Sequence, residues 1–198
     1  MAVRIQGTST NVAGGVKEVT VSDAGRLNTL AATQTGATVA ALDSNAYNLN
    51  TGVIASLSTA NSALFYYKHL EDEPIIFDSF VIGLNDAASS DIHTATIIRN
   101  PTTGTIVSGA SAGAISQNRD FGSANTLSNS TFYKGADGNT FTDGSDYITL
   151  YAAENSRTFF NIDTVLRKGN SIGVKITPSL SSGTISCYVA AICHIASL

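Results

Sequence analysis

The sequence predicts an all-β protein, an antiparallel β-sandwich of the jelly-roll type with an extended N-terminal arm. Three observations lead to this prediction. Apolar and β-branched segments recur through residues 47–198, separated by turns rich in Gly, Asn, Asp and Pro. No segment keeps a helical stripe over about 12 residues or more. Strands and helices do not alternate, which argues against a parallel doubly wound sheet.

The N-terminal part of the chain is the least regular. We expect residues 1–46 to form an arm and an extended segment, and residues 47–198 to form the sandwich domain. Residues 1–15 end in a run of Thr, Ser, Asn and Gly that favours a loose chain. Residues 16–21 alternate weakly and predict a short strand. Residues 22–46 are rich in Ala and Thr and predict an extended segment with room for one helical turn.

The strands of the sandwich domain are separated by recognisable turns. Asn100–Gly104 predicts a hairpin turn with Gly late in its loop, and Lys168–Asn170 predicts a second tight turn. The segment Ile75–Leu84 is apolar on both faces, which is typical of a buried strand. The other expected strands are Tyr47–Ser56, Ser62–Leu70, Ile92–Arg99, Thr105–Ser108, Tyr147–Ala152, Thr164–Arg167, Ser171–Pro178 and Thr184–Ile195.

Residues 116–146 interrupt this β pattern. They are rich in Asn, Asp, Ser and Gly and contain few large apolar side chains. A segment of this length without regular structure is typical of a functional loop or an inserted excursion. We therefore expect a long loop excursion inside the sandwich domain.

The composition excludes several classes of protein. Charged residues make up 13% of the chain, against about 25% in an ordinary soluble domain, and the formal net charge is −4. This balance argues against a protein that grips nucleic acid by its phosphates. No apolar run is long enough to span a membrane, and Met1–Gly7 lacks the apolar core of a secretory signal. We expect a folded protein without nucleic-acid or membrane partners.

The two cysteines indicate the compartment. Cys187 and Cys193 lie in one predicted strand, where their thiols face the same side roughly 20 Å apart, at about 3.3 Å per residue. A disulfide needs Cα atoms within about 7 Å, so this strand excludes a bridge between them. We expect two buried free thiols, in a chain made in reducing cytoplasm.

One pattern suggests catalysis. Gly109–Gly113 spells G-x-S-x-G with Ser111 at its centre, and Asp146 or Asp163 and then His194 follow in the order found in α/β-hydrolases. That motif needs a helix directly after the serine and parallel strands around it, and this sequence predicts neither. The pentapeptide arises easily in a chain rich in Gly, Ala and Ser. We therefore expect no enzymatic activity and no catalytic residue.

No metal or cofactor site is expected either. Asp137–Asp146 offers oxygen ligands on a loop, as a calcium site does, but it lacks the EF-hand spacing and contains ordinary turn sequences. His69, His93 and His194 are isolated from one another and from any cysteine pair. Glu71–Glu73 can be read as paired carboxylates for acid–base chemistry, but a solvated turn explains them more simply.

Two stretches resemble a known family. The first consists of Val19–Leu27, Asn45–Ile54, Ser62–Lys68 and Ile75–Ile82, and the second is Val165–Pro178. In pattern, over roughly half of the chain, they resemble the capsid decoration (cement) proteins of tailed bacteriophages that have a jelly-roll domain. The resemblance implies a structural homotrimer on the virion surface that binds the major capsid protein and braces the shell after DNA packaging. It implies no catalytic residue.

The composition is compatible with such a role, because a charge-poor surface lowers the cost of removing an interface from water. Two other functions stay open. One is a receptor- or glycan-binding module of a head fibre or tail tip, with its site in residues 116–146. The other is a hydrolase that uses Ser111.

Overall fold

The computed structural model describes residues 36–58, 60–85, 92–108, 115–153, 155–180 and 183–196, and the short strands β1 (Gly7–Thr8) and β2 (Val16–Lys17). The chain divides into two compact units, Met1–Gln34 and Thr35–Leu198. In the first unit β1 pairs with β2 in antiparallel orientation, so β2 lies within the strand predicted at 16–21. The predicted arm and extended segment otherwise lie outside the described residues up to residue 35.

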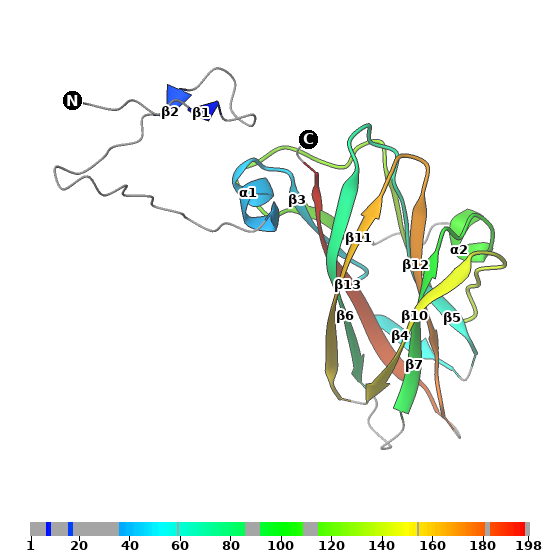
Figure 1. Cartoon of the computed structure of the whole chain (residues 1–198). Coiled ribbons are helices and arrows are strands. Elements are labelled where there is room, and N and C mark those ends of the chain that lie inside the picture. The colour runs from blue at the N-terminus through cyan, green and yellow to red at the C-terminus, as the bar shows by residue number, and fades with distance from the viewer. Residues whose placement is uncertain are drawn as a thin grey trace, which may run out of the picture. The chain divides into compact units, whose positions relative to one another are not determined.

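The second unit contains two antiparallel sheets. Its strands are β3 (Ala46–Asn50), β4 (Ile54–Leu57), β5 (Ser62–Lys68), β6 (Ile75–Asn85), β7 (Ile92–Arg99), β8 (Ile115–Asn118), β9 (Thr131–Lys134), β10 (Ser145–Ala153), β11 (Arg157–Leu166), β12 (Ser171–Thr177) and β13 (Ile185–Ile195). One sheet has five strands in the order β10-β7-β12-β5-β9. The other has six, in the order β11-β6-β13-β3-β8, with β4 also paired to β13. The two sheets form the two layers in Figure 1, which confirms the predicted antiparallel sandwich.

The strand pairs of this unit are nested along the chain. β7 pairs with β10, β6 with β11, β5 with β12 and β3 with β13, so the chain runs out and returns along itself as one long hairpin. Two further pairings, β6 with β13 and β7 with β12, fold this hairpin into two layers. The connection from β7 to β10, residues 100–144, is the tip of the hairpin. It includes most of the loop predicted at 116–146, and from here on the excursion means residues 100–144.

Aromatic side chains from both sheets meet between the layers. Phe65 of the five-stranded sheet contacts Phe80 of the six-stranded sheet edge-on, with ring centroids 5.3 Å apart. Phe77 stacks on Phe80 at 5.6 Å, and all three rings are fully buried. Each such aromatic pair adds about 0.5–1.5 kcal/mol beyond the burial of its area. These contacts hold the two layers face to face.

Both cysteines of β13 belong to this core. Cys187 and Cys193 are free and buried, as predicted. Burial raises the pKa of the Cys187 thiol to about 12 and also raises that of Cys193. The two thiols are therefore protonated at neutral pH and act as small apolar groups.

The predicted strand at Thr105–Ser108 is wrong, and so is the hairpin across Asn100–Gly104. Thr105–Ser108 forms the short helix α2. Its β-branched side chains favour a strand, but tertiary contacts override this preference. Ile106 is fully buried on the outer side of the five-stranded sheet, where it belongs to a cluster with Ala63 and Tyr66.

The excursion is more regular than the sequence predicts. β8 pairs with β3 and β9 pairs with β5, so the excursion supplies the outermost strand at one edge of each sheet. An open edge exposes unpaired backbone groups that other chains can join. The outer strands left at the opposite edges are β10 and β11, and each carries a bulge, between Asp146 and Ile148 and between Asn161 and Thr164.

β11 begins at Arg157, earlier than the strand predicted from Thr164. The part of β11 before Thr164 includes Asn161 and Asp163, which are residue types that disfavour strands, and here both are exposed on an edge strand. The predicted turn at Lys168–Asn170 is present. It connects β11 to β12 and therefore links the two sheets.

Helix α1 (Gly36–Leu42) lies within the segment predicted to be extended, and it is longer than the one turn expected there. It packs against β3 and β13, and Ala40 is buried.

Candidate interaction surface

The outer faces of the two sheets differ in how much of each is covered by other parts of the chain and in which side chains they expose. The excursion covers part of the five-stranded sheet, where Ile106, Tyr133 and Phe141 pack with Ala63 and Tyr66. Figure 1 shows α2 on the outer side of this layer. The Phe141 ring also lies against Gly173 of β12, so closely that a Cβ at Gly173 would overlap it. This part of the outer face is a second, small core.

The uncovered part of the same face mixes hydroxyl and charged groups with the exposed side chains of Ile92 and Tyr151. The register places Lys175 of β12 beside Thr96 of β7. The hydroxyl oxygens of Thr96 and Thr149 lie 3.4 Å apart, and Lys175 pairs with Asp146 at 2.9 Å. Hydroxyl and charged groups of this kind are what an antiparallel sheet presents to water.

The outer face of the six-stranded sheet carries apolar side chains on β13, β6 and β11. Neighbouring strands β13, β6 and β11 set their outward side chains in rows that run across the sheet. The rows are Tyr188/Gly83/Arg157, Ala190/Val81/Phe159, Ile192/Ser79/Asn161 and His194/Ile76/Val165. We call their apolar members the apolar face, namely Ile76, Val81, Phe159, Val165, Tyr188, Ala190 and Ile192. Phe159 is 59% exposed and Val165 is 51% exposed.

Polar groups lie among and beside these side chains: Ser79 and Asn161 stand in the rows, and the exposed Asn48 and Asn50 of β3 lie next to Ile192 and Ala190. Nδ1 of His194 and Oδ2 of Asp78 lie 3.0 Å apart. Arg157 and Asp163 are exposed on β11, where Arg157 begins the strand and Asp163 lies in the bulge between Asn161 and Thr164. Neither of them forms an ion pair within the described part of the chain.

Carboxylates of the predicted calcium-like loop Asp137–Asp146 fasten this loop to residues outside it. Asp137 accepts hydrogen bonds from the backbone N–H and the hydroxyl of Ser58, at 2.9 and 3.1 Å. Asp143 accepts bonds from the Thr102 hydroxyl and from the backbone N–H of Thr102 and Thr103. These bonds, the one from the Thr102 hydroxyl first, lower the pKa of Asp143 to about 2.

The carboxylates of this loop therefore face different parts of the molecule. Asp146, the last of them, pairs with Lys175 of the five-stranded sheet. In the ranges that the structure describes, no three side chains of His, Cys, Asp or Glu gather into a group that could hold a metal ion.

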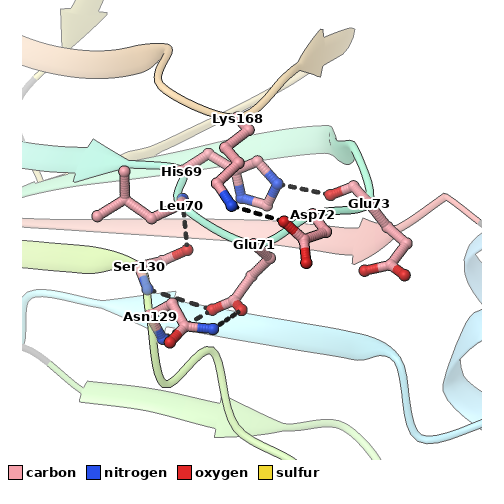
Figure 2. Close-up of polar contacts among 8 residues, drawn as sticks. All are labelled: His69, Leu70, Glu71, Asp72, Glu73, Asn129, Ser130 and Lys168. Carbon is pink, nitrogen blue, oxygen red and sulfur yellow. Dashed lines mark hydrogen bonds and ion pairs between the residues drawn. The ribbon is translucent and has the colours of Figure 1, made fainter.

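The turn after β5 fastens the excursion at its other side, as Figure 2 shows. The Glu71 carboxylate accepts bonds from the backbone N–H of Asn129 and Ser130, at 3.0 and 3.1 Å, and from Nδ2 of Asn129 at 2.7 Å. Partial burial raises the pKa of Glu71, but these bonds outweigh it and hold the pKa below its usual value. Asp72 pairs with Lys168 at 2.5 Å. The predicted solvated turn therefore also holds residues 129–130 of the excursion against the end of β5; we call these Glu71 contacts the clamp.

His69 is fully buried beside this turn. Its Nε2 lies 2.7 Å from the Glu73 carbonyl oxygen, and its Nδ1 lies 3.0 Å from the Tyr67 hydroxyl. Because a carbonyl oxygen only accepts, Nε2 carries the proton and the Tyr67 hydroxyl donates to Nδ1. Burial lowers the pKa of His69, so the ring is neutral at pH 7. With both nitrogens engaged, His69 supports the turn.

The remaining candidate residues do not come together. His93 is buried on β7, in the five-stranded sheet, whereas His194 lies on β13 of the six-stranded sheet and pairs with Asp78. Asp163 lies on β11 and makes no pair with His194. Ser111 and the whole of 109–113 lie outside the described residues.

Two pockets lie near these features. One, with a volume of about 580 Å³, is lined by Tyr47, Glu71 and Glu73. The other, about 380 Å³, is lined by residues that include Arg157 and Tyr188, at one end of the apolar face. Both carboxylates of the first pocket belong to the turn already described.

Sequence reasoning missed the apolar face, although one signal for it was present. A strand that is apolar on both faces predicts burial on both faces. β6 is such a strand, and the sandwich covers only its inner face.

Among the described residues, no helix has the length and apolar character needed to cross a membrane. Comparison of the chain with protein-family models, with curated proteins and with solved structures finds no match in any of the three. The apolar face is therefore assigned as the candidate functional surface from its geometry and chemistry.

Proposed function

We propose that this chain is a structural virion protein that decorates and stabilises the capsid of a tailed bacteriophage, binding the major capsid protein as a homotrimer. The resemblance of Asn45–Ile54 and Val165–Pro178 to capsid decoration proteins supports this proposal. The observation that carries it is the apolar face, since a bare, apolar sheet surface is suited to cover by another protein.

We infer further that the sandwich is a jelly roll, a fold of eight strands in two Greek keys. The nested pairs β3/β13, β5/β12, β6/β11 and β7/β10 support this inference. So does the mixing of early and late strands in each sheet, with β13 between β3 and β6 and β12 between β5 and β7.

The low charge of the chain fits an assembly role. Buried charges cost desolvation energy, and interface centres are depleted of them. Only 13% of the residues are charged. Several of the charged side chains are already used within the chain, as in Lys168–Asp72 and Lys175–Asp146.

The proposal is tested by mixing the purified protein with expanded shells that lack it. We expect saturable binding that is visible by negative stain and that raises the temperature at which shells rupture. Phe159→Glu is expected to weaken this binding at least about tenfold, because a charge at the centre of an apolar contact costs 1.4 kcal/mol or more. Tyr151→Glu is the matched control, because Tyr151 is exposed on the uncovered part of the five-stranded sheet. Wild-type protein that leaves shells bare overturns the proposal.

A second function, a receptor- or glycan-binding module, is favoured by one observation in the excursion. Phe121 is 97% exposed on a loop that hydrogen bonds hold in place, since Ser44 donates to Asp120 at 2.6 Å and Asn118 donates to the Ser44 carbonyl at 2.7 Å. A fixed, exposed ring is a surface on which a sugar can stack. Binding to host cells or glycans that is lost in Phe121→Ala and kept in Tyr151→Ala would establish this function in place of the first.

A further inference from the structure

We propose that the cavity at one end of the sandwich, where the turn after β5 meets β3, β13 and the excursion, binds a primary alkylammonium group. This group forms the tip of a lysine side chain and of a free aliphatic amine, and it carries a positive charge and three N–H donors on an apolar stem. The inference goes beyond capsid decoration and does not depend on it, because the cavity shares no residue with the apolar face.

The cavity is formed by segments that are far apart in the sequence, and backbone hydrogen bonds hold its walls in place. The backbone N–H of Ile195, at the end of β13, donates to the Asn45 carbonyl at 2.8 Å. The backbone N–H of Ala196 donates to the Pro74 carbonyl, also at 2.8 Å, and so joins the end of β13 to the turn. The volume of about 580 Å³ lies within the range of about 300–1,000 Å³ that is usual for ligand sites.

Two carboxylates give the cavity a negative charge. Glu71 and Glu73 both line it, whereas Asp72 between them pairs with Lys168 (Figure 2). Partial burial raises the pKa of Glu71, but the clamp outweighs it, so this carboxylate is ionised at neutral pH. Glu73 forms no ion pair within the described part of the chain. A cation that enters the cavity therefore meets two negative charges, and the lining residues include no Lys or Arg.

A buried hydroxyl group points to a ligand in the same place. Tyr47 is 3% exposed, and its hydroxyl forms no hydrogen bond to any residue that the structure describes. This oxygen is not sealed from solvent, so it opens onto the cavity that Tyr47 lines. Burial raises the pKa of Tyr47, and the nearby Glu71 carboxylate raises it further. Because buried polar groups in proteins are nearly always hydrogen-bonded, a donor inside the cavity would supply the partner that this oxygen lacks.

The acceptors suit an ammonium group better than a guanidinium group. A carboxylate has about four lone-pair positions, and the clamp occupies three of those on Glu71, which leaves one. A guanidinium group pairs best with both oxygens of one carboxylate, whereas an ammonium group donates single bonds to separate acceptors. Glu71, Glu73 and the Tyr47 hydroxyl supply three such acceptors for the three N–H groups of an alkylammonium ion.

Apolar side chains complete the lining and suit the stem of the ligand. Leu127 and Ile195 pack against the core and are only partly buried, so part of each side chain is left to line the cavity. The methylene groups of a lysine side chain lie readily along such apolar surface while the charged nitrogen stays among polar groups. The cavity therefore matches both parts of an alkylammonium ligand, its stem and its charge.

The test titrates the isotope-labelled full-length chain with three small probes and follows the backbone amide signals by nuclear magnetic resonance. Nα-acetyl-lysine methylamide carries the lysine side chain, diaminobutane is a free amine, and Nα-acetyl-norleucine methylamide has an apolar stem without the charge. We expect saturable shifts of the Glu73, Leu127 and Ile195 amides with at least one charged probe and none with the norleucine probe. The charged probe that binds more tightly identifies the source of the group, a protein lysine or a free amine.

Two conservative variants assign the binding to the cavity. Glu73→Gln removes one charge, and Tyr47→Phe removes only the hydroxyl and keeps the ring in the core. Each variant is expected to raise the dissociation constant at least about fivefold, which is the effect of one hydrogen bond. Asp163→Asn is the matched control, because it removes an exposed carboxylate from β11, which does not line the cavity, and it is expected to bind as wild type does. Far-ultraviolet circular dichroism and melting temperature verify that all three variants fold.

The outcomes decide the proposal in either direction. Loss of affinity in Glu73→Gln and Tyr47→Phe, with Asp163→Asn unchanged, supports it. The proposal is overturned if neither charged probe shifts the three amides, if the norleucine probe binds equally well, or if either cavity variant binds as tightly as wild type. A loss in Asp163→Asn as large as that in Glu73→Gln also overturns it, because the net charge of the chain rather than the cavity would then hold the probe.

Discussion

The two sheets of the sandwich treat their outer faces in opposite ways. The five-stranded sheet is partly covered by its own chain, through Ile106 and Phe141 of the excursion, and its uncovered part mixes hydroxyl and charged groups with exposed Ile92 and Tyr151. The six-stranded sheet leaves Phe159 and Val165 exposed beside the apolar centre of its outer face. Both sheets have apolar residues on two sides, so apolar content does not distinguish them. The outer faces differ because the excursion, residues 100–144, packs on the five-stranded sheet.

The largest effect is expected from one of two matched truncations, which test the comparison by shortening an isoleucine on each outer face. Ile106→Ala removes a fully buried side chain from the covered face and is expected to lower the free energy of unfolding by about 3 kcal/mol. Ile192→Ala makes the same change on the apolar face, where the side chain is only half-buried, and is expected to cost less than about 1 kcal/mol in dilute protein. Urea unfolding of the variants measures both values. Equal losses would show that the two faces are not differently covered.

A smaller loss is expected where the excursion is fastened. Glu71→Ala removes an acceptor of hydrogen bonds from Asn129 and Ser130, and the expected cost is about 1–2 kcal/mol. Glu73→Ala is the control, because the Glu73 side chain is exposed and only its backbone carbonyl is used, by His69. Hydrogen exchange is expected to increase around residues 129–134 in the first variant alone. Equal stability of the two variants would mean that the Glu71 carboxylate does not hold the excursion.

The same end of β5 is expected to make stability depend on pH. Burial lowers the pKa of His69 in the folded state, so the unfolded chain binds the proton more readily. The stability that comes from burying neutral His69 is fully present above the pKa of a histidine in the unfolded chain, about 6.5. It is lost as pH falls below that value, by at most about 1.4 kcal/mol per pH unit. The measurement is the unfolding free energy between pH 8 and pH 5, for wild type and His69→Gln. A slope that His69→Gln leaves unchanged would contradict this assignment.

The smallest effect is expected on the polar part of the five-stranded sheet. Lys175 and Asp146 form an ion pair at 2.9 Å, but the Asp146 side chain is 62% exposed. Exposed pairs of this kind contribute less than about 1 kcal/mol and are screened by salt. Lys175→Met is therefore expected to lower the free energy of unfolding by less than about 1 kcal/mol, which is less than the expected loss in Ile106→Ala. Urea unfolding at low and high salt measures this change. A large loss that added salt does not reduce would show that this face is less solvated than its composition indicates.

The sequence was sufficient to predict the sandwich because its signals are local. Alternation and turn residues place most strands, and Lys168–Asn170 is a turn in the structure as predicted. Helix α2 could not be predicted in the same way. Thr105–Ser108 is β-branched at several positions, and its helical form depends on Ile106 entering a site made by Ala63 and Tyr66, which lie far away in the sequence.

The candidate surface depends even more on distant pairing. Val81, Phe159 and Ala190 form one row only because β11 and β13 both pair with β6, and local sequence does not reveal that register. The sequence does show that β6 is apolar on both faces, but it does not reveal whether a second layer of the same chain covers it. The clamp at Glu71 was equally hidden, because its partners Asn129 and Ser130 lie in the excursion.

The position of β13 has a consequence for how the chain matures. This strand, Ile185–Ile195, lies between β3 and β6 in the middle of the six-stranded sheet. During synthesis, β3 and β6 therefore wait for a neighbour that emerges from the ribosome after all the other strands. Pairing over such separations makes folding slow and leaves strand edges exposed in the meantime. The centre of the six-stranded sheet is therefore complete only once Ile185–Ile195 has been made.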